Sequence, residues 1–259
     1  MTGLITDRSR APRGSLVHWA CVPLLAGLSP STAAEPLVAP GPDSIAAVAD
    51  PQIAARPIPP ALAPYFTAVS DAANTPDSDG FLRRWLLLEP IAKPNRTNTG
   101  FTATYVRQAL AASQPGSPAA IPRDGQVEKA AAPLRWHALD SKGFDVKLFD
   151  FAKALGAPTY GVIFWATTIV DSPREQRDVR LAVGSNAASI WWLNGTEAVG
   201  LFNDRRMVMD DVLSDRLTLR KGRNVIRGAV INGPGLSSFC VRFVDEAGRP
   251  ITDLTTHVR

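Results

Sequence analysis

The chain has 259 residues, and its 28 lysines and arginines nearly balance its 24 aspartates and glutamates. Such a balance argues against a basic surface for nucleic acid or for an anionic membrane, and the chain has no apolar run of eighteen or more residues that could cross a bilayer. We therefore expect a soluble globular protein with no nucleic-acid partner and no membrane insertion.

The first 34 residues have the features of a secretory signal peptide. A segment with three arginines (8–13) precedes an apolar stretch (16–28), and small residues at 31–34 form a cleavage site. Removal of residues 1–34 leaves 25 basic residues, 23 acidic residues and a single cysteine. The alternative is a disordered N-terminus behind a mistaken start codon. A signal peptide predicts export to the periplasm or the cell exterior.

A proline- and alanine-rich segment, 35–64, comes next and has little apolar periodicity. Such a composition is typical of a linker or an arm on the surface. A single folded domain is therefore expected over 65–259. Its first elements are predicted to be a turn of helix at 66–73, a turn at 77–80 and a buried strand over 81–90.

Apolar residues at helical spacing predict a helix over 101–112, with Asn98 or Thr99 as its cap. A loop rich in proline, glycine and alanine is expected over 114–133. The other strand-like segments are 134–139, 145–151, 160–170, 212–220, 225–231 and 237–245.

The clearest local signal is a β-hairpin over 180–199. Asn194-Gly195 tolerates two successive positive φ angles, so it favours the two-residue type I′ turn. The turn predicts the facing pairs Leu193 with Thr196, Trp192 with Glu197, Trp191 with Ala198 and Ile190 with Val199. One face then carries Trp191, Leu193 and Ala198, and the other carries Trp192 beside Glu197.

Alternation also assigns inward positions in the later strands. The residues expected to point inward are Leu213, Leu217 and Leu219 in one strand and Phe239, Val241 and Phe243 in another. Cys240, in the latter strand, is expected to be a small buried side chain rather than a reactive thiol. Eight or nine short strands with closely spaced turns predict an all-β fold, a β-sandwich with one or two short helices.

Five motifs stand in order between Val179 and Pro250, namely L-A-V-G-S-N, W-L-N-G-T-E, D-R-R, L-R-K-G-R-N-V-I and F-V-D-E-A-G-R-P. This region resembles the galactose-binding-like jelly-roll modules of bacterial polysaccharide-degrading enzymes, including some acetylxylan esterases. The resemblance implies a jelly-roll fold and an accessory role beside such enzymes. It implies no single ligand, because the fold includes sugar binders, structural spacers and enzyme-packing domains.

Sugar recognition needs an aromatic face and planar polar side chains that grip hydroxyl groups. Trp192 can supply the face. The polar residues expected at the same end are Asn194, Glu197, Asp204, Arg205 and Arg206. The alternative is that another strand or the N-terminal arm covers Trp192. Trp136 and Trp165 are expected in the core.

A structural calcium ion is the one cofactor that the sequence suggests. Asp204, Asp210 and Asp211 could supply hard oxygen ligands, and modules of the kind that the chain resembles often carry calcium. No loop has the spacing of an EF-hand, and one cysteine with two mature histidines cannot build a zinc site without carboxylates. No other cofactor is expected.

Catalytic motifs are weak. The chain has no Gly-x-Ser-x-Gly motif, and of its three histidines only His137 is placed where a triad could use it. A histidine within a strand is more typical of cross-strand hydrogen bonding. Three hypotheses follow: a non-catalytic carbohydrate-binding module, a structural or protein-interaction domain without sugar affinity, and a carbohydrate esterase. The expected partner is a plant or bacterial polysaccharide, or an enzyme that degrades one.

Overall fold

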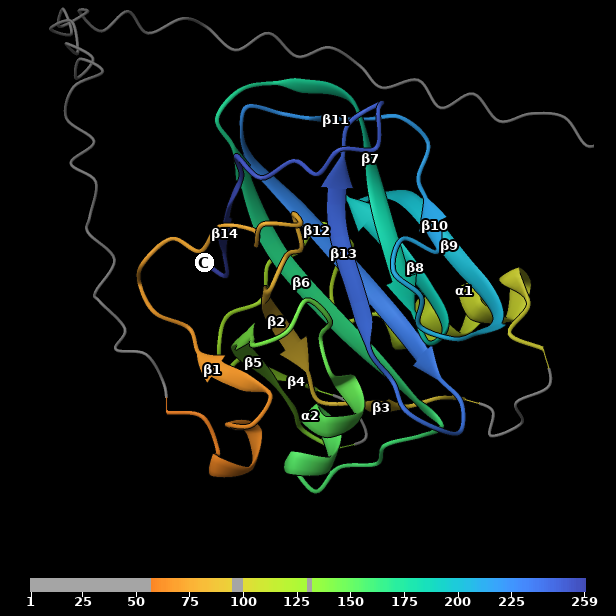
Figure 1. Cartoon of the computed structure of the whole chain (residues 1–259). Coiled ribbons are helices and arrows are strands. Elements are labelled where there is room, and N and C mark those ends of the chain that lie inside the picture. The colour runs from red at the N-terminus through yellow and green to blue at the C-terminus, as the bar shows by residue number, and fades with distance from the viewer. Residues whose placement is uncertain (1–56, 95–99, 130–131) are drawn as a thin grey trace, which may run out of the picture. The chain divides into compact units, whose positions relative to one another are not determined.

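The computed structural model describes residues 57–94, 100–129 and 132–259 (Figure 1). The expected signal peptide and most of the expected arm lie outside these residues. The described residues form fourteen strands in two antiparallel sheets, with two α-helices and one short 3-10 helix. The predicted all-β sandwich with one or two short helices is confirmed.

The large sheet has ten strands. Its main path runs β1 (Phe66–Ala68), β5 (Leu134–Ser141), β2 (Arg84–Leu88), β6 (Val162–Ser172), β12 (Gly222–Asn232), β8 (Ala187–Leu193) and β9 (Thr196–Arg205). The short strands β3 (Ile91–Ala92) and β14 (Thr255–His257) also pair with β6, and β4 (Val127–Glu128) pairs with β5. The centre of the sheet is the β6–β12 pair, which shares eleven register positions.

The small sheet is built around β7 (Gln176–Ser185). Its other strands are β10 (Val212–Leu213), β11 (Leu217–Leu219) and β13 (Phe239–Val244), and all three pair with β7. The main hydrophobic core includes apolar residues of both sheets. It contains the expected inward residues Leu219, Phe239, Val241 and Phe243. Cys240 is also buried, as predicted.

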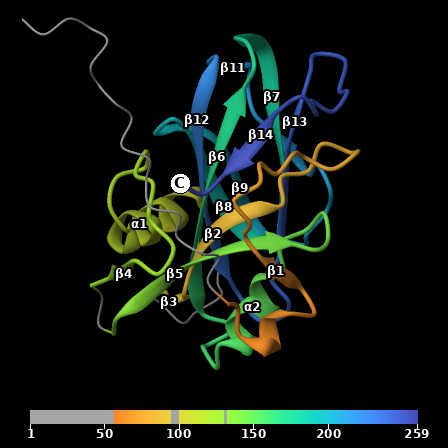
Figure 2. The same ribbon diagram turned by 90° about the vertical axis from the view of Figure 1, so that its left-hand side faces the viewer.

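A second apolar cluster covers the outer face of the large sheet. Helix α1 (Ala103–Ser113) contributes Val106, Ala109 and Leu110, which meet strand residues such as Trp136 and Trp165. Figure 2 shows α1 on the side of the large sheet opposite β7 and β13. Both faces of the central strands are therefore buried, and the prediction that Trp136 and Trp165 belong to the core is confirmed.

Two predicted segments have a different secondary structure. The segment 66–73 was expected to contain a turn of helix, but Phe66–Ala68 is strand β1 and pairs with β5. The segment 145–151 was expected to be a strand, but Leu148–Ala154 is helix α2. The cause is visible in the buried residues of α2, Leu148, Phe151 and Ala152, which have the i, i+3, i+4 spacing of a helix face.

Two smaller expectations also need correction. Helix α1 is capped by Thr102, whose side chain accepts a hydrogen bond from the Tyr105 amide, whereas the expected caps at 98 and 99 lie outside the described residues. Leu213 was expected to point inward but is 46% exposed, because 212–220 forms two short strands rather than one. The 3-10 helix η1 (Pro60–Leu62) buries Leu62 in the main core, so the folded part begins before residue 65.

The predicted hairpin is present as β8 and β9, but residues 180–185, which were expected in its first strand, lie in β7 of the small sheet. Asn194 and Gly195 have φ angles of 53° and 86°, and Leu193 and Trp192 pair with Thr196 and Glu197 as expected. The register then shifts, since Trp191 pairs with Val199 and not with Ala198. Ala198 has no register partner in β8, which is the geometry of a β-bulge. The next expected pair, Ile190 with Val199, is displaced by one residue for the same reason.

Candidate functional site

Trp192 lies on the outer face of the large sheet and is half-buried. Its ring stacks on Trp165 with the ring centroids 5.7 Å apart and the planes 20° from parallel. It also packs against the second apolar cluster. Trp192 therefore serves the outer core with one face of its ring, which leaves less surface for a ligand than we expected.

Asn194 holds the hairpin turn to the neighbouring strand. Its side-chain Oδ1 accepts a hydrogen bond of 2.9 Å from the Val225 amide, and its Nδ2 donates one of 3.0 Å to Asn224 Oδ1. Both ends of the amide are thus engaged. The side chain fixes the turn against β12, and only the remaining lone pair and proton could meet a ligand.

Glu197 is exposed at the start of β9. It accepts a hydrogen bond of 2.5 Å from Arg107 of α1, and the Arg107 guanidinium lies 5.1 Å from the centroid of the Phe202 ring. This ion pair ties α1 to β9. It also neutralises the carboxylate that the sequence placed beside Trp192.

The other three predicted polar residues lie at the far end of β9. Glu197 pairs with Trp192, but Arg205 pairs with Ala187, eight residues further along the strand. At about 3.3 Å per residue the two ends are roughly 26 Å apart. The structure therefore does not bring Asp204, Arg205 and Arg206 together with Trp192, Asn194 and Glu197.

Two of the three calcium candidates, Asp210 and Asp211, are each hydrogen-bonded to a different arginine. Arg205 donates two hydrogen bonds to Asp211, and Arg242 donates to both carboxylate oxygens of Asp210, with 3.1 Å from its Nε to each. Asp204 instead lies near Lys93, whose pKa is lowered by burial while Asp204 acts in the opposite direction. Within the described residues, no group of three histidine, cysteine or carboxylate side chains could hold a metal. The calcium site stays a prediction.

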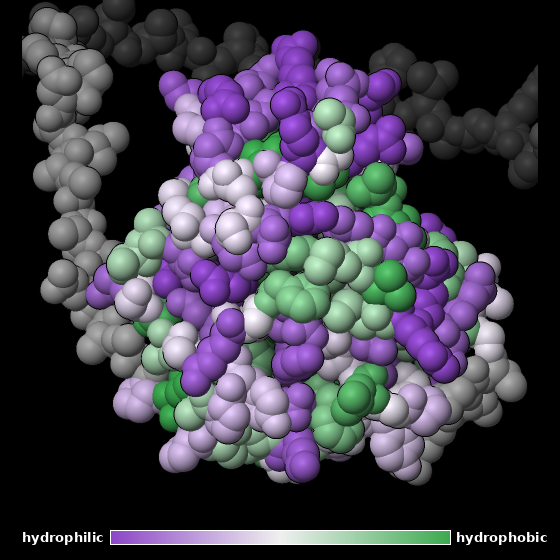
Figure 3. Space-filling model, viewed as in Figure 1, coloured by the Kyte–Doolittle hydropathy of each residue, from purple (hydrophilic) through white to green (hydrophobic). Residues whose placement is uncertain are grey.

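An open groove lies beside the hairpin turn, and we call it the turn groove. Its volume is about 410 Å³, and it is lined by Glu175, Leu193, Asn194, Thr196, Glu197, Leu217, Thr218 and Arg220. It brings the β8–β9 turn of the large sheet next to β11 of the small sheet. In Figure 3 the end of the sandwich at β7 and β11 is mostly hydrophilic.

The turn groove combines two leucines with hydroxyl, amide, carboxylate and guanidinium groups. Glu197 is paired with Arg107, and Glu175 accepts a hydrogen bond of 2.6 Å from Arg177. The Arg220 guanidinium has no hydrogen bond or ion pair within the described residues. The groove thus offers one cation without a partner in the described part of the chain, beside two ion-paired carboxylates and neutral polar groups.

The sequence identified Asn194 and Glu197 of this groove and missed the others. Glu175, Thr218 and Arg220 come from segments that meet the turn only because β11 pairs with β7. A polar residue between two leucines in an alternating strand marks Thr218 as exposed, but nothing local shows which neighbours it has.

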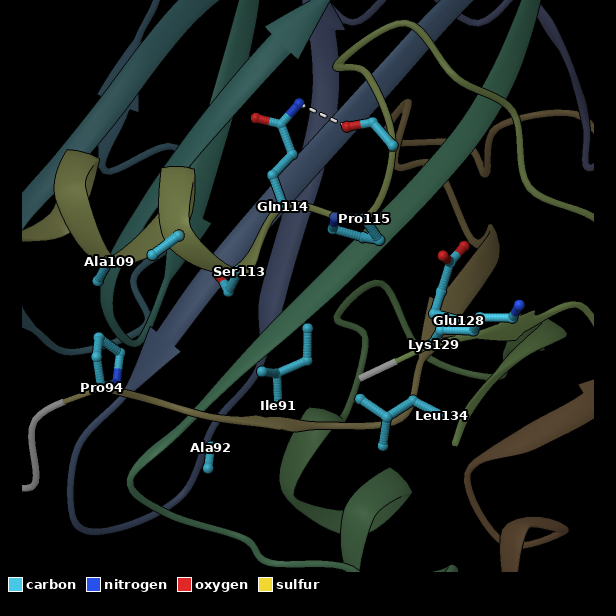
Figure 4. Close-up of a pocket in the computed structure, with 12 residues that line it drawn as sticks. Ile91, Ala92, Pro94, Ala109, Ser113, Gln114, Pro115, Glu128, Lys129 and Leu134 are labelled. Carbon is cyan, nitrogen blue, oxygen red and sulfur yellow. Dashed lines mark hydrogen bonds between the residues drawn. The ribbon is translucent and has the colours of Figure 1, made fainter. Parts of the chain in front are cut away.

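A second hollow, of about 490 Å³, lies between β3 and the end of α1 (Figure 4). Its wall includes Ile91, Ala109 and Leu134, and Gln114 donates a hydrogen bond of 2.8 Å to the Gly116 carbonyl at its rim. Four of its twelve lining residues have polar or charged side chains, namely Ser113, Gln114, Glu128 and Lys129. This hollow has fewer polar groups to orient a sugar than the turn groove has.

Neither described histidine has triad geometry. His137 Nε2 lies 2.9 Å from Glu89 Oε1, and no hydroxyl or thiol group within the described residues is hydrogen-bonded to it. His257 Nε2 lies 3.3 Å from both Thr255 Oγ1 and Asp171 Oδ2. A triad needs the nucleophile and the acid on opposite ring nitrogens, and here both contacts use the same one.

No protein-family model matches the chain, and no curated protein matches it either. Among solved structures, a PA14 sugar-binding domain from an RTX adhesin is similar, with a TM-score of 0.37 and 12% identity over 67% of this chain and 96% of that chain. The PA14 domain of the antifreeze protein MpAFP has a TM-score of 0.40 and 13% identity over 72% and 96%. With TM-scores below 0.5, we draw no functional argument from either likeness. The resemblance to galactose-binding-like jelly rolls stays a prediction.

Within the described residues, no helix has both the length and the apolarity needed to span a membrane; the longest, α1, has eleven residues.

Proposed function

We propose that this protein binds glycans without transforming them, and that the turn groove is its binding site. The observation that carries the proposal is the composition of this groove. Leu217, which is half-buried, can contact the C–H face of a sugar ring, and hydroxyl, amide and charged groups beside it can bind the hydroxyl groups of the sugar. Its volume of about 410 Å³ lies within the range of ligand sites, about 300–1,000 Å³.

The groups of the turn groove are suited to binding a sugar rather than to cleaving one. Hydrolysis of a glycosidic bond needs two carboxyl groups with different protonation states facing one bond. The groove has two glutamates, but each forms an ion pair with its own arginine, Glu175 with Arg177 and Glu197 with Arg107. Each carboxylate is thus paired with an arginine that does not line the groove, an arrangement suited to binding rather than to proton transfer.

Affinity electrophoresis through gels that contain xylan, pectin or arabinogalactan tests the proposal. The variant is Thr218→Val with Arg220→Gln, which removes a hydroxyl and a charge from exposed positions of the groove. Loss of two hydrogen bonds, one of them charged, predicts an affinity at least tenfold weaker. The matched control is Arg123→Gln, because Arg123 is also exposed, has no side-chain partner within the described residues and does not line the groove.

A wild-type protein that is retarded by none of a broad set of glycans would refute glycan binding. Retardation that the groove variant retains in full would refute the groove as the site. In that case Arg206→Gln and Trp192→Ala separate the two ends of β9, which are the positions that the sequence suggested.

We also propose that the protein is exported and binds a plant or bacterial polysaccharide, or works beside an enzyme that degrades one. The support is the signal-peptide pattern of residues 1–34 and the resemblance of 179–250. N-terminal sequencing of the protein from periplasm or culture medium tests export, and a mature chain that still begins at Met1 would contradict it.

A structural or protein-interaction role is the second candidate. It is favoured by three exposed apolar side chains close together in the chain after β9, those of Val208, Met209 and Leu213. Exposed apolar groups in one place are typical of protein contacts. The triple change to serine would abolish capture of a periplasmic partner if this surface were used, and it would leave glycan binding in the turn groove unchanged.

A further inference from the structure

Arg227 is a fully buried cation in the middle of the large sheet. It stands on the outer face of β12, in register with Thr167 of β6 on one side and Trp192 of β8 on the other. Its guanidinium carbon lies 5.0 Å from the centroid of the Trp165 ring and 5.8 Å from that of Trp136. The aromatic rings thus enclose the charge in the second apolar cluster.

The guanidinium group is only partly hydrogen-bonded. Its Nη1 donates to the Ser117 carbonyl and its Nη2 to the Pro115 carbonyl. Its Nε has no acceptor within the described residues, and the same holds for Trp165 Nε1 and Thr167 Oγ1. All three residues are at most 1% exposed.

These three groups share one face of the sheet. Arg227 and Thr167 are directly paired, and Trp165 is two residues from Thr167 along β6, where strand alternation returns it to the same face. Side chains of a facing pair have Cβ atoms about 5 Å apart. Three hydrogen-bond donors therefore gather in one small region, and each costs about 1–3 kcal/mol if it stays unpaired.

Within the described residues, no carboxylate accepts a hydrogen bond from the Arg227 guanidinium. Glu128 is the acidic group that acts on Arg227 through space, but its Oε1 accepts hydrogen bonds of 2.9 Å from Trp136 Nε1 and Gln126 Nε2. Burial lowers the pKa of Arg227 to about 10, which still leaves it protonated at neutral pH. A buried charge needs a counter-charge or a full set of hydrogen bonds.

We propose that a halide ion, such as chloride, binds beside Arg227 and accepts hydrogen bonds from Arg227 Nε, Trp165 Nε1 and Thr167 Oγ1. A halide fits this set better than water does. Two of the groups are pure donors and the third can donate, whereas a water molecule must also place its own two hydrogens on acceptors. The ion also balances the guanidinium charge. This site is independent of the turn groove.

Diffraction from crystals grown in sodium bromide tests the proposal directly, because bromide gives an anomalous signal. We expect an anomalous peak within hydrogen-bond distance of Arg227 Nε and Thr167 Oγ1. The absence of a peak there overturns the proposal. Peaks only on the protein surface also overturn it and indicate an adventitious ion only.

Thermal unfolding supplies the second measurement. At constant ionic strength, replacing gluconate, which is too large for the site, by bromide should raise the melting temperature by about 3–5 °C for each tenfold increase above the dissociation constant. Thr167→Val keeps the shape of the side chain and removes one donor. In this variant the rise should begin at bromide concentrations about tenfold higher, the loss expected for one hydrogen bond to a charge.

Ser237→Ala is the matched control, because Ser237 Oγ is also buried without a partner within the described residues but lies outside this set of donors. It should keep the wild-type bromide dependence. A melting temperature that is equal in bromide and gluconate, or a dependence that Thr167→Val leaves unchanged, would contradict the halide site.

Discussion

Gly228→Ala should destabilise the protein although Gly228 lies in a regular strand. Gly228 of β12 faces Trp191 of β8. A methyl group at this position would lie 2.2 Å from Trp191 Cζ3 and 2.4 Å from Cε3. Contacts below 3 Å between carbon atoms are strongly repulsive, so either the ring or the strand must move.

The Trp191 ring cannot move easily. It is fully buried, its Nε1 donates a hydrogen bond of 2.9 Å to Ser189 Oγ, and its centroid lies 6.0 Å from Trp85 and 5.0 Å from Phe239. Overpacking in such a core costs about 1–3 kcal/mol, and loss of the Ser189 hydrogen bond adds about 1 kcal/mol. Alanine is favoured over glycine in a strand by only about 0.5–1 kcal/mol. The steric cost wins, and the net loss should be about 2–3 kcal/mol.

Urea denaturation followed by far-UV circular dichroism measures this loss. Gly143→Ala is the control, because a methyl group there meets its nearest atom at 3.4 Å and its φ is not positive. A double-mutant cycle with Trp191→Leu isolates the contact, since Gly228→Ala should cost little once the ring is gone. Equal stability of Gly228→Ala and wild type, or an equal loss in the Trp191→Leu background, would refute the reasoning.

Three further predictions concern the fold. Asp140→Asn should cost about 3–5 kcal/mol in urea denaturation, because it removes the counter-charge of buried Arg84 and one of the two oxygens that accept its hydrogen bonds. Burial raises the pKa of the Cys240 thiol to about 11 from 9.0, so between these pH values the folded state binds the thiol proton more tightly than the unfolded state does. The stability of wild type should therefore fall relative to that of Cys240→Ala as the pH rises from 9 to 11. A stability difference that stays constant over this range would contradict the prediction. Asn194→Ala should lower the free energy of unfolding by about 2 kcal/mol, because alanine is strained at this positive φ and the Val225 amide loses its acceptor. Asn194→Gly should relieve the strain, so that its cost comes only from the lost hydrogen bonds.

The turn and the strand positions next to it follow from local chemistry. Asn194-Gly195 favours one turn type, and that turn determines the two pairs nearest to it, which the structure confirms. The bulge at Ala198 is not determined by the turn. It places Val199 opposite Trp191, and both side chains lie in the main core, which residues of the other sheet complete.

The segment around α2 shows why a short pattern can mislead. Val146 and Leu148 fit the alternation of a strand, whereas Leu148 and Phe151 fit the i, i+3 spacing of a helix, so these few residues support both interpretations. Val146 does form a bridge with Phe239, as a strand residue would. The chain then turns into a helix, and the deciding residue is Ala152, which lies just beyond the segment that alternation suggested.

The candidate sites were the least predictable part. The turn groove joins residues from both sheets, and β11 meets the hairpin only through the topology. Arg227 reads in the sequence as one charge among apolar strand residues, which normally marks a residue that faces solvent. Its burial depends on α1 and the loop after it, which cover the outer face of the large sheet.

The C-terminal strand β14 has a consequence for association between molecules. Strand β2 pairs with β6 only at 166 and 167, and β14 takes over the same side of β6 at 169–171. Removal of 255–259 would expose a row of unpaired amide and carbonyl groups on β6, a central strand, and such a row is a template for a strand from another molecule. Residues 255–259 thus protect β6 from pairing with another molecule. Their removal should produce concentration-dependent oligomers before it causes unfolding.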